Sequence, residues 1–503
     1  MKKQTIRVIL IGVLLILFCV FSFLFYFSVQ WLEVAFSGIT LREVIFHLQV
    51  PLKGTSKEMI NSFIGKVIIP GFIIFFILLI VNLLGFKFPL VLYSERTGRQ
   101  WQLGKIVSRF CKILCIPVSA VLILLSLDSL VINFKLDEYV KGYFQRTTIY
   151  AREYIDPANV RFTFPEKKRN LVFIIMESIE STFFREEDGG YYKEDLMPEL
   201  RKLALKNVHF SNNGLLGGAA QVSGTGWTVA ALVSHLLGIP LVLPIHGNAY
   251  EGYEQFLPGA TGLTDILDSA GYQQRFLIGS DKKFAGRDVL FKTHGNILIK
   301  DLQYYKENGK IPNDYHVWWG FEDEKLYALA KEELQELSSR PYPFNLMLLT
   351  VDTHHVGGYV CNLCKNNFDS QYKNVIACAS RQVSSFVSWI QSQPWYDNTT
   401  IVIIGDHLYM DGSFVPYNAD RRTYNVYINS VAKTERVKYR QFSALDTFPT
   451  ILDSLGVYYD GPGLALGRSL YRDTETLIEK YGIKYLSEEI VKKNQKYDAL
   501  LHY

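Results

Sequence analysis

The chain has 503 residues, of which 49% are hydrophobic and 14% aromatic, and its net charge is +4. This length suits a membrane anchor followed by one large globular domain. Residues 1–134 carry 13 Lys and Arg against 5 Asp and Glu, a net of +8, which leaves about −4 for residues 135–503. The basic excess therefore belongs to the apolar N-terminal part, and the charge gives no reason to expect a nucleic acid as a partner.

The N-terminal part contains three apolar runs, each long enough to cross the hydrocarbon core of a bilayer. They cover Val8–Val29, Val67–Phe86 and Ile113–Phe134, and only Asp128 interrupts the third. The first run is too long for a removable signal peptide and lacks a small-residue cleavage site, so we expect it to remain as an anchor. The sequence therefore predicts a three-span membrane anchor over residues 1–134.

Basic residues predict the orientation of this anchor. They precede the first run and fill the segment between the second and third runs: Lys2, Lys3, Arg7, Arg96, Arg99, Lys105, Arg109 and Lys112. Such segments stay on the cytoplasmic side, and an odd number of spans places the rest of the chain on the other side. We expect a multi-pass protein of the bacterial inner (cytoplasmic) membrane, with an extracytoplasmic C-terminal part.

Residues 135–169 are charged and aromatic, a composition typical of an interfacial helix and linker near the lipid headgroups. From Asn170 onward, short apolar runs alternate with helical patterns. The predicted strands are Leu171–Met176, Arg275–Ile278, Asn345–Thr350, Thr400–Ile404 and Tyr424–Ile428, and the predicted helices cover 197–206, 262–270, 322–339, 376–393 and 443–455. This alternation predicts an α/β domain over residues 170–503, with a mostly parallel sheet covered by helices on both faces.

Polar residues follow three of these strands, at the edge where parallel sheets bind ligands. Glu177 follows the first strand, His354 and His355 follow the third, and Asp406-His407 follows the fourth. Carboxylates and imidazoles are suitable ligands for a divalent metal. Each also has a simpler interpretation: Glu177 as a solvated strand end or helix cap, Asp406-His407 as a surface turn, and the paired histidines as a polar loop.

Thr225 lies at the glycine-flanked start of a predicted helix that ends at Gly238. A hydroxyl there faces unpaired N–H groups and the positive end of the helix dipole, and a nearby metal would lower its pKa further. Thr225 is therefore a candidate nucleophile, with simple helix capping as the alternative. Arg287 is either an exposed ion-pairing residue or a planar phosphate clamp.

Three cysteines lie in the predicted exported part, where disulfides persist. We expect one disulfide from Cys378 to Cys361 or Cys364. The Cys361-x-x-Cys364 spacing also suggests zinc, but three cysteines without a nearby fourth ligand make a weak site.

Together these segments resemble the lipoteichoic acid synthase and phosphoglycerol transferase family, a branch of the alkaline phosphatase and sulfatase superfamily. The segments that carry the resemblance are Asn170–Ser178, Gly224-Thr225 with Gly238–Leu241, Phe284–Arg287, Thr350–His355, Gly405–His407 and Asp446–Leu452. The resemblance implies an alkaline phosphatase/sulfatase-like domain in which Glu177, Thr225, Asp406 and His407 hold one divalent metal. That metal is most often Mn²⁺, with Mg²⁺ or Zn²⁺ as alternatives. It also implies that Thr225 is the nucleophile and that Arg287, His354 and His355 bind the substrate.

The chain also departs from the synthases. Ala285 stands where they carry tryptophan, and three predicted spans replace five. Phe284-Ala285-Gly286 and Thr350–His355 look more like the periplasmic phosphoglycerol transferases that decorate glucans. The resemblance therefore favours a transferase that moves glycerophosphate from phosphatidylglycerol to an exported glycan or glycolipid.

Four other functions remain open at this point. They are a phosphoethanolamine transferase, a lipoteichoic acid synthase-like polymerase, a phosphodiesterase or sulfatase-type hydrolase, and a non-catalytic glycan-binding protein. A sulfatase needs Cys or Ser for conversion to formylglycine, which Thr225 does not provide. A non-catalytic protein would be expected to lack a metal ligand, yet all four are present.

Overall fold

The computed structural model describes residues 2–36, 39–49, 57–87, 91–93, 100–242, 255–411, 414–415 and 419–501. The chain divides into two compact units. The membrane unit comprises Met1–Leu41 and Thr55–Asp137, and the α/β unit comprises Arg42–Gly54 and Glu138–Tyr503. A short stretch between the first two apolar segments thus belongs to the C-terminal unit.

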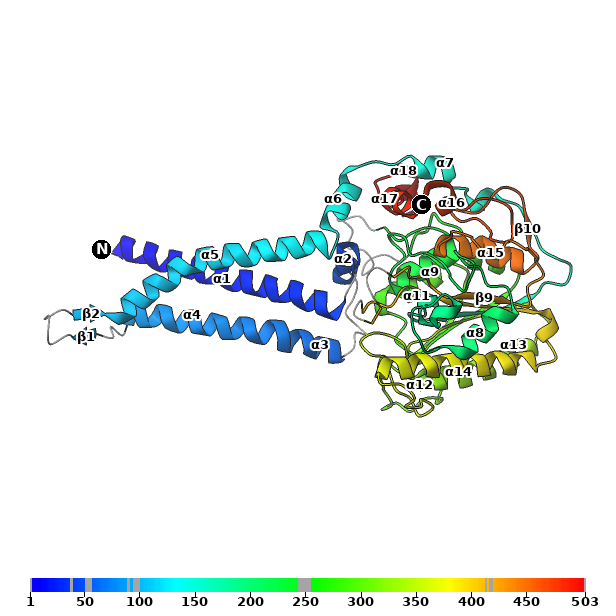
Figure 1. Cartoon of the computed structure of the whole chain (residues 1–503), viewed down its shortest axis with the longest axis horizontal. Coiled ribbons are helices and arrows are strands. Elements are labelled where there is room, and N and C mark those ends of the chain that lie inside the picture. Colours follow the sequence, from blue (N-terminus) through cyan, green and yellow to red (C-terminus); the bar gives the residue numbers. More distant parts are fainter. Residues whose placement is uncertain are drawn as a thin grey trace. The chain divides into compact units, whose positions relative to one another are not determined.

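The membrane unit is built from long apolar helices (Figure 1). Within the described residues, three helical stretches are long and apolar enough to cross a membrane: Leu10–Ala35, Met59–Leu83 and Arg109–Ile132. Each overlaps one predicted run, with shifted ends because a helix does not have to stop where its apolar stretch stops. The elements are α1 (Lys2–Ala35), α3 (Lys57–Phe63), a π-helical turn η1 (Ile64–Ile68), α4 (Ile69–Lys87), β1 (Val91–Tyr93), β2 (Gln100–Gln102) and α5 (Leu103–Ile132).

The α/β unit is organised around a six-stranded sheet of order β6-β5-β7-β4-β8-β9. All neighbours pair in parallel except β8 and β9. This confirms the predicted mostly parallel sheet and adds β6, which the sequence did not predict. The strands are β4 (Asn170–Met176), β5 (Gln273–Ile278), β6 (Leu298–Lys300), β7 (Phe344–Leu349), β8 (Thr399–Gly405) and β9 (Asn425–Ile428).

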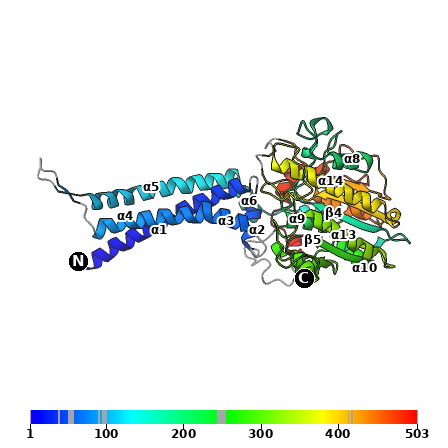
Figure 2. The same cartoon turned by 90° about the horizontal axis from the view of Figure 1, so that it is seen from below.

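The central strand β4 is buried on both faces. Leu171, Phe173 and Ile175 join one apolar cluster, and the alternating residues of the strand join the other. A strand covered on both faces is continuously apolar, which explains the run that predicted it. Figure 2 shows α8 and α14 on one side of the sheet and α10 on the other.

Helices of the two clusters cover the two faces. One cluster includes residues of α9 (Thr228–Leu237), α10 (Leu263–Ser269), α11 (Arg287–Thr293), α15 (Thr447–Ser454), α16 (Leu477–Tyr481), α17 (Ile483–Glu489) and α18 (Gln495–Leu500). The other includes residues of α8 (Pro198–Lys206), α12 (Leu302–Glu307), α13 (Asp323–Ser338) and α14 (Gln371–Gln391).

The segment expected to lie at the membrane interface contains α6 (Leu136–Phe144), α7 (Ile149–Glu153) and β3 (Phe162–Thr163), which pairs with β10 (Tyr458–Tyr459). Tyr150 of this segment packs inside the α/β unit, away from any lipid headgroups. It is buried, and its hydroxyl donates to the Ile490 carbonyl at 2.7 Å. Its ring packs on Tyr497, because the C-terminal helices fold back over α7.

Helix α2 (Leu41–Gln49) contributes most of its residues to the α/β unit. The Arg42 guanidinium lies 5.4 Å from the centre of the Tyr139 ring, a cation–π contact. This contact joins α2 to α6 within the same unit.

The expected disulfide is absent from the structure. The Sγ atom of Cys361 lies 3.7 Å from Sγ of Cys364 and 3.7 Å from Sγ of Cys378. A disulfide requires about 2.05 Å. The three thiols form a cluster in which Cys361 is equally close to both partners, so the prediction of one pair was wrong.

Candidate metal and phosphate site

Three potential metal ligands converge at the carboxyl ends of two neighbouring strands. Glu177 directly follows β4, and Asp406 and His407 follow β8, whose residue Gly405 pairs with the last residue of β4. Nε2 of His407 lies 3.4 Å from Oε1 of Glu177 and 3.4 Å from Oδ2 of Asp406. All three side chains are buried. The parallel pairing therefore brings the residues together as predicted.

Gly405 permits this close arrangement. A Cβ atom at this position would lie 1.8 Å from the carbonyl oxygen of Ile179. Only glycine leaves room for the backbone after β4 to pass this close to β8. Gly405 is thus required by backbone contact, independently of the role of the two polar residues that follow it.

Hydrogen bonds orient two of the candidate ligands. Nδ1 of His407 lies 2.9 Å from the Leu408 carbonyl, so that nitrogen carries the proton and Nε2 presents its lone pair. Oδ1 of Asp406 accepts backbone N–H groups from Ser178 at 2.8 Å and from His407 at 2.7 Å. Among the described residues, Nε2 of His407 and Oδ2 of Asp406 are buried without a hydrogen-bond partner. Unpartnered ligand atoms that face one another fit a bound cation.

Glu177 is held from both sides. Its Oε1 accepts the Ser178 hydroxyl at 2.6 Å, and its Oε2 accepts the Thr228 hydroxyl at 3.4 Å. Its backbone N–H donates to Oγ1 of Thr350 at 3.0 Å. Ser178 has φ of +55°, so strained backbone of the kind found at functional sites lies beside the cluster.

The electrostatics of the cluster reflect crowded negative charge. Burial, reinforced by the charge of Glu177, raises the pKa of Asp406 to about 7. Burial alone would lower the pKa of His407, but the charges of Asp406 and Glu177 outweigh it, and that pKa is raised. A divalent cation at this position would relieve the repulsion between the carboxylates.

Thr225 does not lie at the start of the helix, so the prediction of its position was wrong. Helix α9 begins at Thr228, and Thr225 closes a turn in which its N–H and its hydroxyl both point to the Val222 carbonyl, at 3.2 and 2.8 Å. Gly224 in this turn has φ of +80°, which ends the regular geometry before the helix begins. Thr228, in the first helical turn, is the residue whose hydroxyl reaches Glu177.

The turn that carries Thr225 is nevertheless joined to the segment that follows His407. Oε1 of Gln221 accepts the backbone N–H of Leu408 at 2.9 Å, directly after His407. The role of Thr225 as metal ligand and nucleophile stays a prediction.

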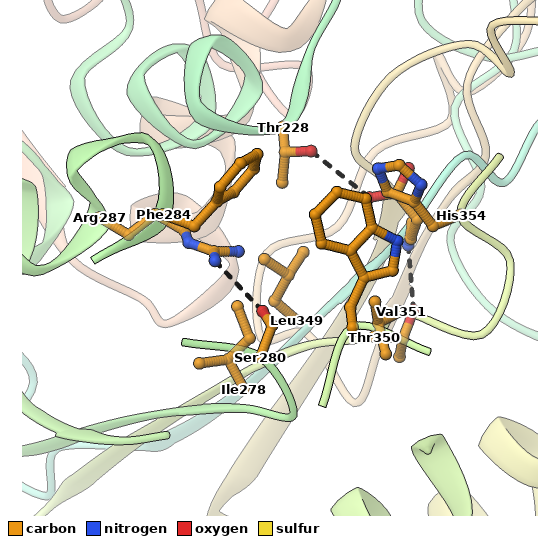
Figure 3. Close-up of a pocket in the computed structure, with 11 residues that line it drawn as sticks. Thr228, Ile278, Ser280, Phe284, Arg287, Leu349, Thr350, Val351 and His354 are labelled. Carbon is orange, nitrogen blue, oxygen red and sulfur yellow. Dashed lines mark hydrogen bonds between the residues drawn. The ribbon is translucent and has the colours of Figure 1, made fainter. Parts of the chain in front are cut away.

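A cavity lies beside the cluster (Figure 3). Its lining residues are Glu177, Thr228, Ile278, Ser280, Phe284, Arg287, Trp319, Leu349, Thr350, Val351 and His354. Figure 3 shows the Arg287 guanidinium and the His354 ring at opposite ends of this cavity. It therefore combines a cation, an imidazole and a carboxylate that is a candidate metal ligand.

Arg287 is buried, so its alternative as an exposed ion-pairing residue is wrong. Its Nη2 donates to Oγ of Ser280 at 3.1 Å and to the Asp281 carbonyl at 2.7 Å, while its Nε has no partner among the described residues. Burial lowers the pKa of Arg287 to about 10, with Asp281 and Glu177 opposing the shift. The guanidinium is therefore a desolvated cation at neutral pH, with a free N–H donor for an anion.

The two adjacent histidines occupy different surroundings. His354 lines the cavity, its ring 4.6 Å from that of Trp319, and burial lowers its pKa despite the charge of Glu177. His355 is also buried, but it packs edge-on against Tyr409 and does not line the cavity. The expectation that both histidines contact the substrate is therefore supported by position for His354 only.

The sequence missed residues that reach the site from distant segments. The Trp319 ring lies tilted against that of Phe284, with ring centres 5.3 Å apart, and brings an indole to the pocket although Ala285 lacks one. Glu43 of α2 approaches the Thr225 turn: a Cβ on Gly226 would lie 2.8 Å from its Oε1. The charge of Glu43 also contributes to the raised pKa of His407. Neither residue belongs to a recognisable motif, so only the tertiary fold reveals them.

The chain belongs to the Sulfatase family, whose pattern it matches over residues 169–457. Enzymes of this superfamily typically depend on a divalent metal. The resemblance inferred from the motifs is thereby confirmed.

More specific relatives are proteins named Phosphoglycerol transferase I. Those of Shigella flexneri and of Escherichia coli strain 55989 are both 34% identical to the chain over 328 residues. The match covers 64% of this chain and 41% of each relative, so the chain aligns with less than half of their length. The integral membrane protein lipooligosaccharide phosphoethanolamine transferase A of Neisseria meningitidis shares the fold, with a TM-score of 0.50 and 12% identity over 89% of this chain and 84% of that one. This likeness confirms the predicted fold of membrane helices followed by a sulfatase-like domain.

Proposed function

We propose that the protein is a membrane-anchored, metal-dependent phosphoglycerol transferase. The observation that carries this proposal is the buried convergence of Glu177, Asp406 and His407 beside a cavity that contains Arg287 and His354. The 34% identity to proteins named Phosphoglycerol transferase I supports the choice of transferred group. Phosphatidylglycerol is the proposed donor, and an exported glycan or glycolipid is the proposed acceptor.

Glu177, Asp406 and His407, with Thr225 as a fourth ligand, would hold one divalent ion, Mn²⁺ in the first place and Mg²⁺ or Zn²⁺ otherwise. When bound, the ion supplies Lewis-acid polarisation of the phosphate and lowers the pKa of a coordinated hydroxyl. The donor set fits this ion because its unpartnered oxygen and nitrogen atoms face one another.

The chain's own residues divide the transfer into two displacements. In the first, Oγ1 of Thr225 forms a bond to the donor phosphorus, and the bond from phosphorus to the diacylglycerol oxygen breaks. The threonine proton moves to the neutral His354 imidazole and then to the leaving oxygen. In the second, the oxygen of an acceptor hydroxyl forms a bond to phosphorus, the bond from phosphorus to Oγ1 of Thr225 breaks, and the acceptor proton moves to Oγ1. Arg287 stabilises charge on the phosphoryl oxygens in both steps.

The membrane helices fit this choice of donor. A lipid headgroup is confined to the membrane surface, and a tethered enzyme meets it at a higher effective concentration than a free one. We place the α/β unit outside the cytoplasm of a bacterial cell, on the basis of the basic segments that flank the spans.

The test is to trap the covalent intermediate. Full-length protein in mixed micelles is given phosphatidylglycerol without acceptor, digested and analysed by mass spectrometry. We expect glycerophosphate on the peptide that contains Thr225, also in Thr225→Ser at a reduced rate, but not in Thr225→Ala. Ser223→Ala, which removes a hydroxyl from the same turn, is the matched control and should keep the adduct.

Different failures of this experiment have different meanings. An adduct formed only from phosphatidylethanolamine would refute the donor but keep the nucleophile. Thr225→Ala activity of about a tenth of wild type or more would exclude Thr225 as the covalent residue.

A further inference from the structure

A second cluster of metal-binding side chains lies outside the candidate active site. The sulfur atoms of Cys361, Cys364 and Cys378 lie within 4.8 Å of one another. Cys361 and Cys378 are buried, and Cys364 is partly buried. The proposed transfer reaction uses none of these thiols.

The spacing of the sulfurs matches that of ligands around one ion. Two of the sulfur pairs, Cys361–Cys364 and Cys361–Cys378, are 3.7 Å apart. Four ligands at about 2.3 Å in a tetrahedron place neighbouring sulfurs about 3.8 Å apart. This separation is far too long for a disulfide.

Gln382 supplies the position of a fourth ligand. Its Nε2 lies 3.5 Å from Sγ of Cys361 and 3.5 Å from Sγ of Cys378. Its Oε1 is buried and, among the described residues, has no hydrogen-bond partner. A half-turn of the amide exchanges these two atoms and aims the oxygen at the sulfurs. In a tetrahedral site the oxygen–sulfur separation is about 3.6 Å. The turned amide would place the oxygen where Nε2 now lies, 3.5 Å from Sγ of Cys361.

The backbone presents the four side chains as two pairs. Cys361 and Cys364 lie on a turn closed by the Cys364 N–H, which donates to the Cys361 carbonyl at 3.1 Å. Cys378 and Gln382 are one helical turn apart on the same face of α14. An ion held by both pairs would fasten the segment after β7 to α14. The same segment carries His354 a few residues earlier.

We propose that Cys361, Cys364, Cys378 and the turned amide of Gln382 bind one zinc ion. With four protein ligands the site is closed, so the ion stabilises structure and has no open position for substrate. Its occupancy holds the loop of His354 against α14. The zinc ion takes no part in the proposed transfer chemistry.

The test uses cobalt as a spectroscopic substitute for zinc. Full-length protein with His407→Ala, which disables the candidate active site, is reduced, stripped of metal and titrated with Co²⁺. We expect a sulfur-to-cobalt charge-transfer absorption that saturates at one equivalent and disappears when Zn²⁺ is added. Cys361→Ser should abolish it, and Cys111→Ser, which removes a thiol from α5, should leave it unchanged.

Two further variants keep the test decisive. Cys364→Ser removes the partly exposed sulfur and should abolish or strongly weaken the absorption even if Cys361→Ser does not fold. Gln382→Ala should lower the Co²⁺ affinity at least tenfold, and an unchanged affinity would refute the amide as a ligand. The absence of sulfur-to-cobalt absorption in the reduced protein, or its persistence in Cys364→Ser, would overturn the site. Transferase activity plays no part in this readout, so failure of the proposed function would leave the result intact.

Discussion

In the candidate active site, Nε2 of His407 lies 3.4 Å from Oε1 of Glu177, and both side chains are shielded from solvent. Asp406 adds a second carboxylate to the same buried space. Burial and the neighbouring charge of Glu177 raise the pKa of Asp406, so its ionisation costs stability when no cation is bound. Without a metal ion the site is therefore expected to lower the free energy of unfolding. A bound metal ion is expected to raise it.

Asp406→Asn tests this balance. The asparagine oxygen keeps the acceptor of the Ser178 and His407 N–H groups but removes one charge and one ligand. Because the folded pKa of Asp406, about 7, exceeds the unfolded value, ionisation costs stability as pH rises from about 4 to 7. At pH 8 without metal, Asp406→Asn should be more stable than the wild type by about 1–2 kcal/mol, and near pH 4 this advantage should vanish.

Thermal unfolding with Mn²⁺ or with a chelator measures the effect of the metal on stability. A transfer assay under the same conditions measures its effect on activity. Mn²⁺ should raise the midpoint of the wild type, and a chelator should abolish its transferase activity. Asp406→Asn should respond to neither. Asp369→Asn, at an exposed carboxylate, is the control and should behave like the wild type. Equal stabilisation of Asp406→Asn by Mn²⁺ would show that the ion binds elsewhere.

Arg287→Lys should lower kcat/KM by about 10²–10³-fold with little loss of folded protein. Lysine keeps the positive charge but lacks the guanidinium whose Nη2 bonds both Ser280 and the Asp281 carbonyl. Steady-state transfer from labelled phosphatidylglycerol measures the effect. Arg340→Lys, at an exposed arginine, should be unchanged. A loss of less than about tenfold would mean that charge alone suffices at this position.

His209→Gln should flatten the dependence of stability on pH between about 4 and 6.5. Burial lowers the pKa of His209 to about 4, and its Nδ1–H donates to the Asn425 carbonyl. Since the folded pKa lies below the unfolded one, the unfolded chain binds more protons and stability falls as the solution is acidified. This residue accounts for up to about 1.4 kcal/mol per pH unit in that interval.

Urea unfolding at pH 7 and pH 5, followed by tryptophan fluorescence, tests the role of His209. The difference between the two midpoints should shrink in His209→Gln and stay as in the wild type in His316→Gln, where the histidine is exposed. An unchanged difference in His209→Gln would mean that other groups carry the acid sensitivity.

The proposed orientation predicts which positions an impermeant thiol reagent reaches. Asn313→Cys, at an exposed position of the α/β unit, should react in intact cells. Arg96→Cys, in the basic segment between the second and third spans, should react only after permeabilisation. The wild type gives the background from its own cysteines. The reverse pattern would place the α/β unit in the cytoplasm and exclude an exported acceptor.

Most of the sheet was predictable because its strands are buried on both faces and read as unbroken apolar runs. The exception, β6, spans only Leu298–Lys300, and its first residue is exposed. The convergence of Glu177, Asp406 and His407 was predictable because each lies just after a recognisable strand. The start of α9 was not, since the left-handed backbone of Gly224 delays the helix until Thr228.

Features that depend on long-range packing left no pattern in the sequence. Trp319 and Glu43 reach the site from a loop and from a helix near the N-terminus, with no motif to identify them. The cysteine spacing allowed either a disulfide or a metal, because linear separation does not reveal the distances between sulfurs. The position of Gln382 could not be predicted for the same reason. Its contacts with the cysteine sulfurs depend on which face of α14 meets the turn at Cys361.

Helix α2 has a consequence for release of the α/β unit from the membrane. The segment Arg42–Gly54 belongs to this unit, yet it is covalently enclosed between two stretches of the membrane unit. A protease that cut once after Asp137 would free a polypeptide lacking Arg42, the partner of the Tyr139 ring, and lacking Glu43 beside the Thr225 turn. A single cut there would therefore release a polypeptide that lacks one segment of the α/β unit.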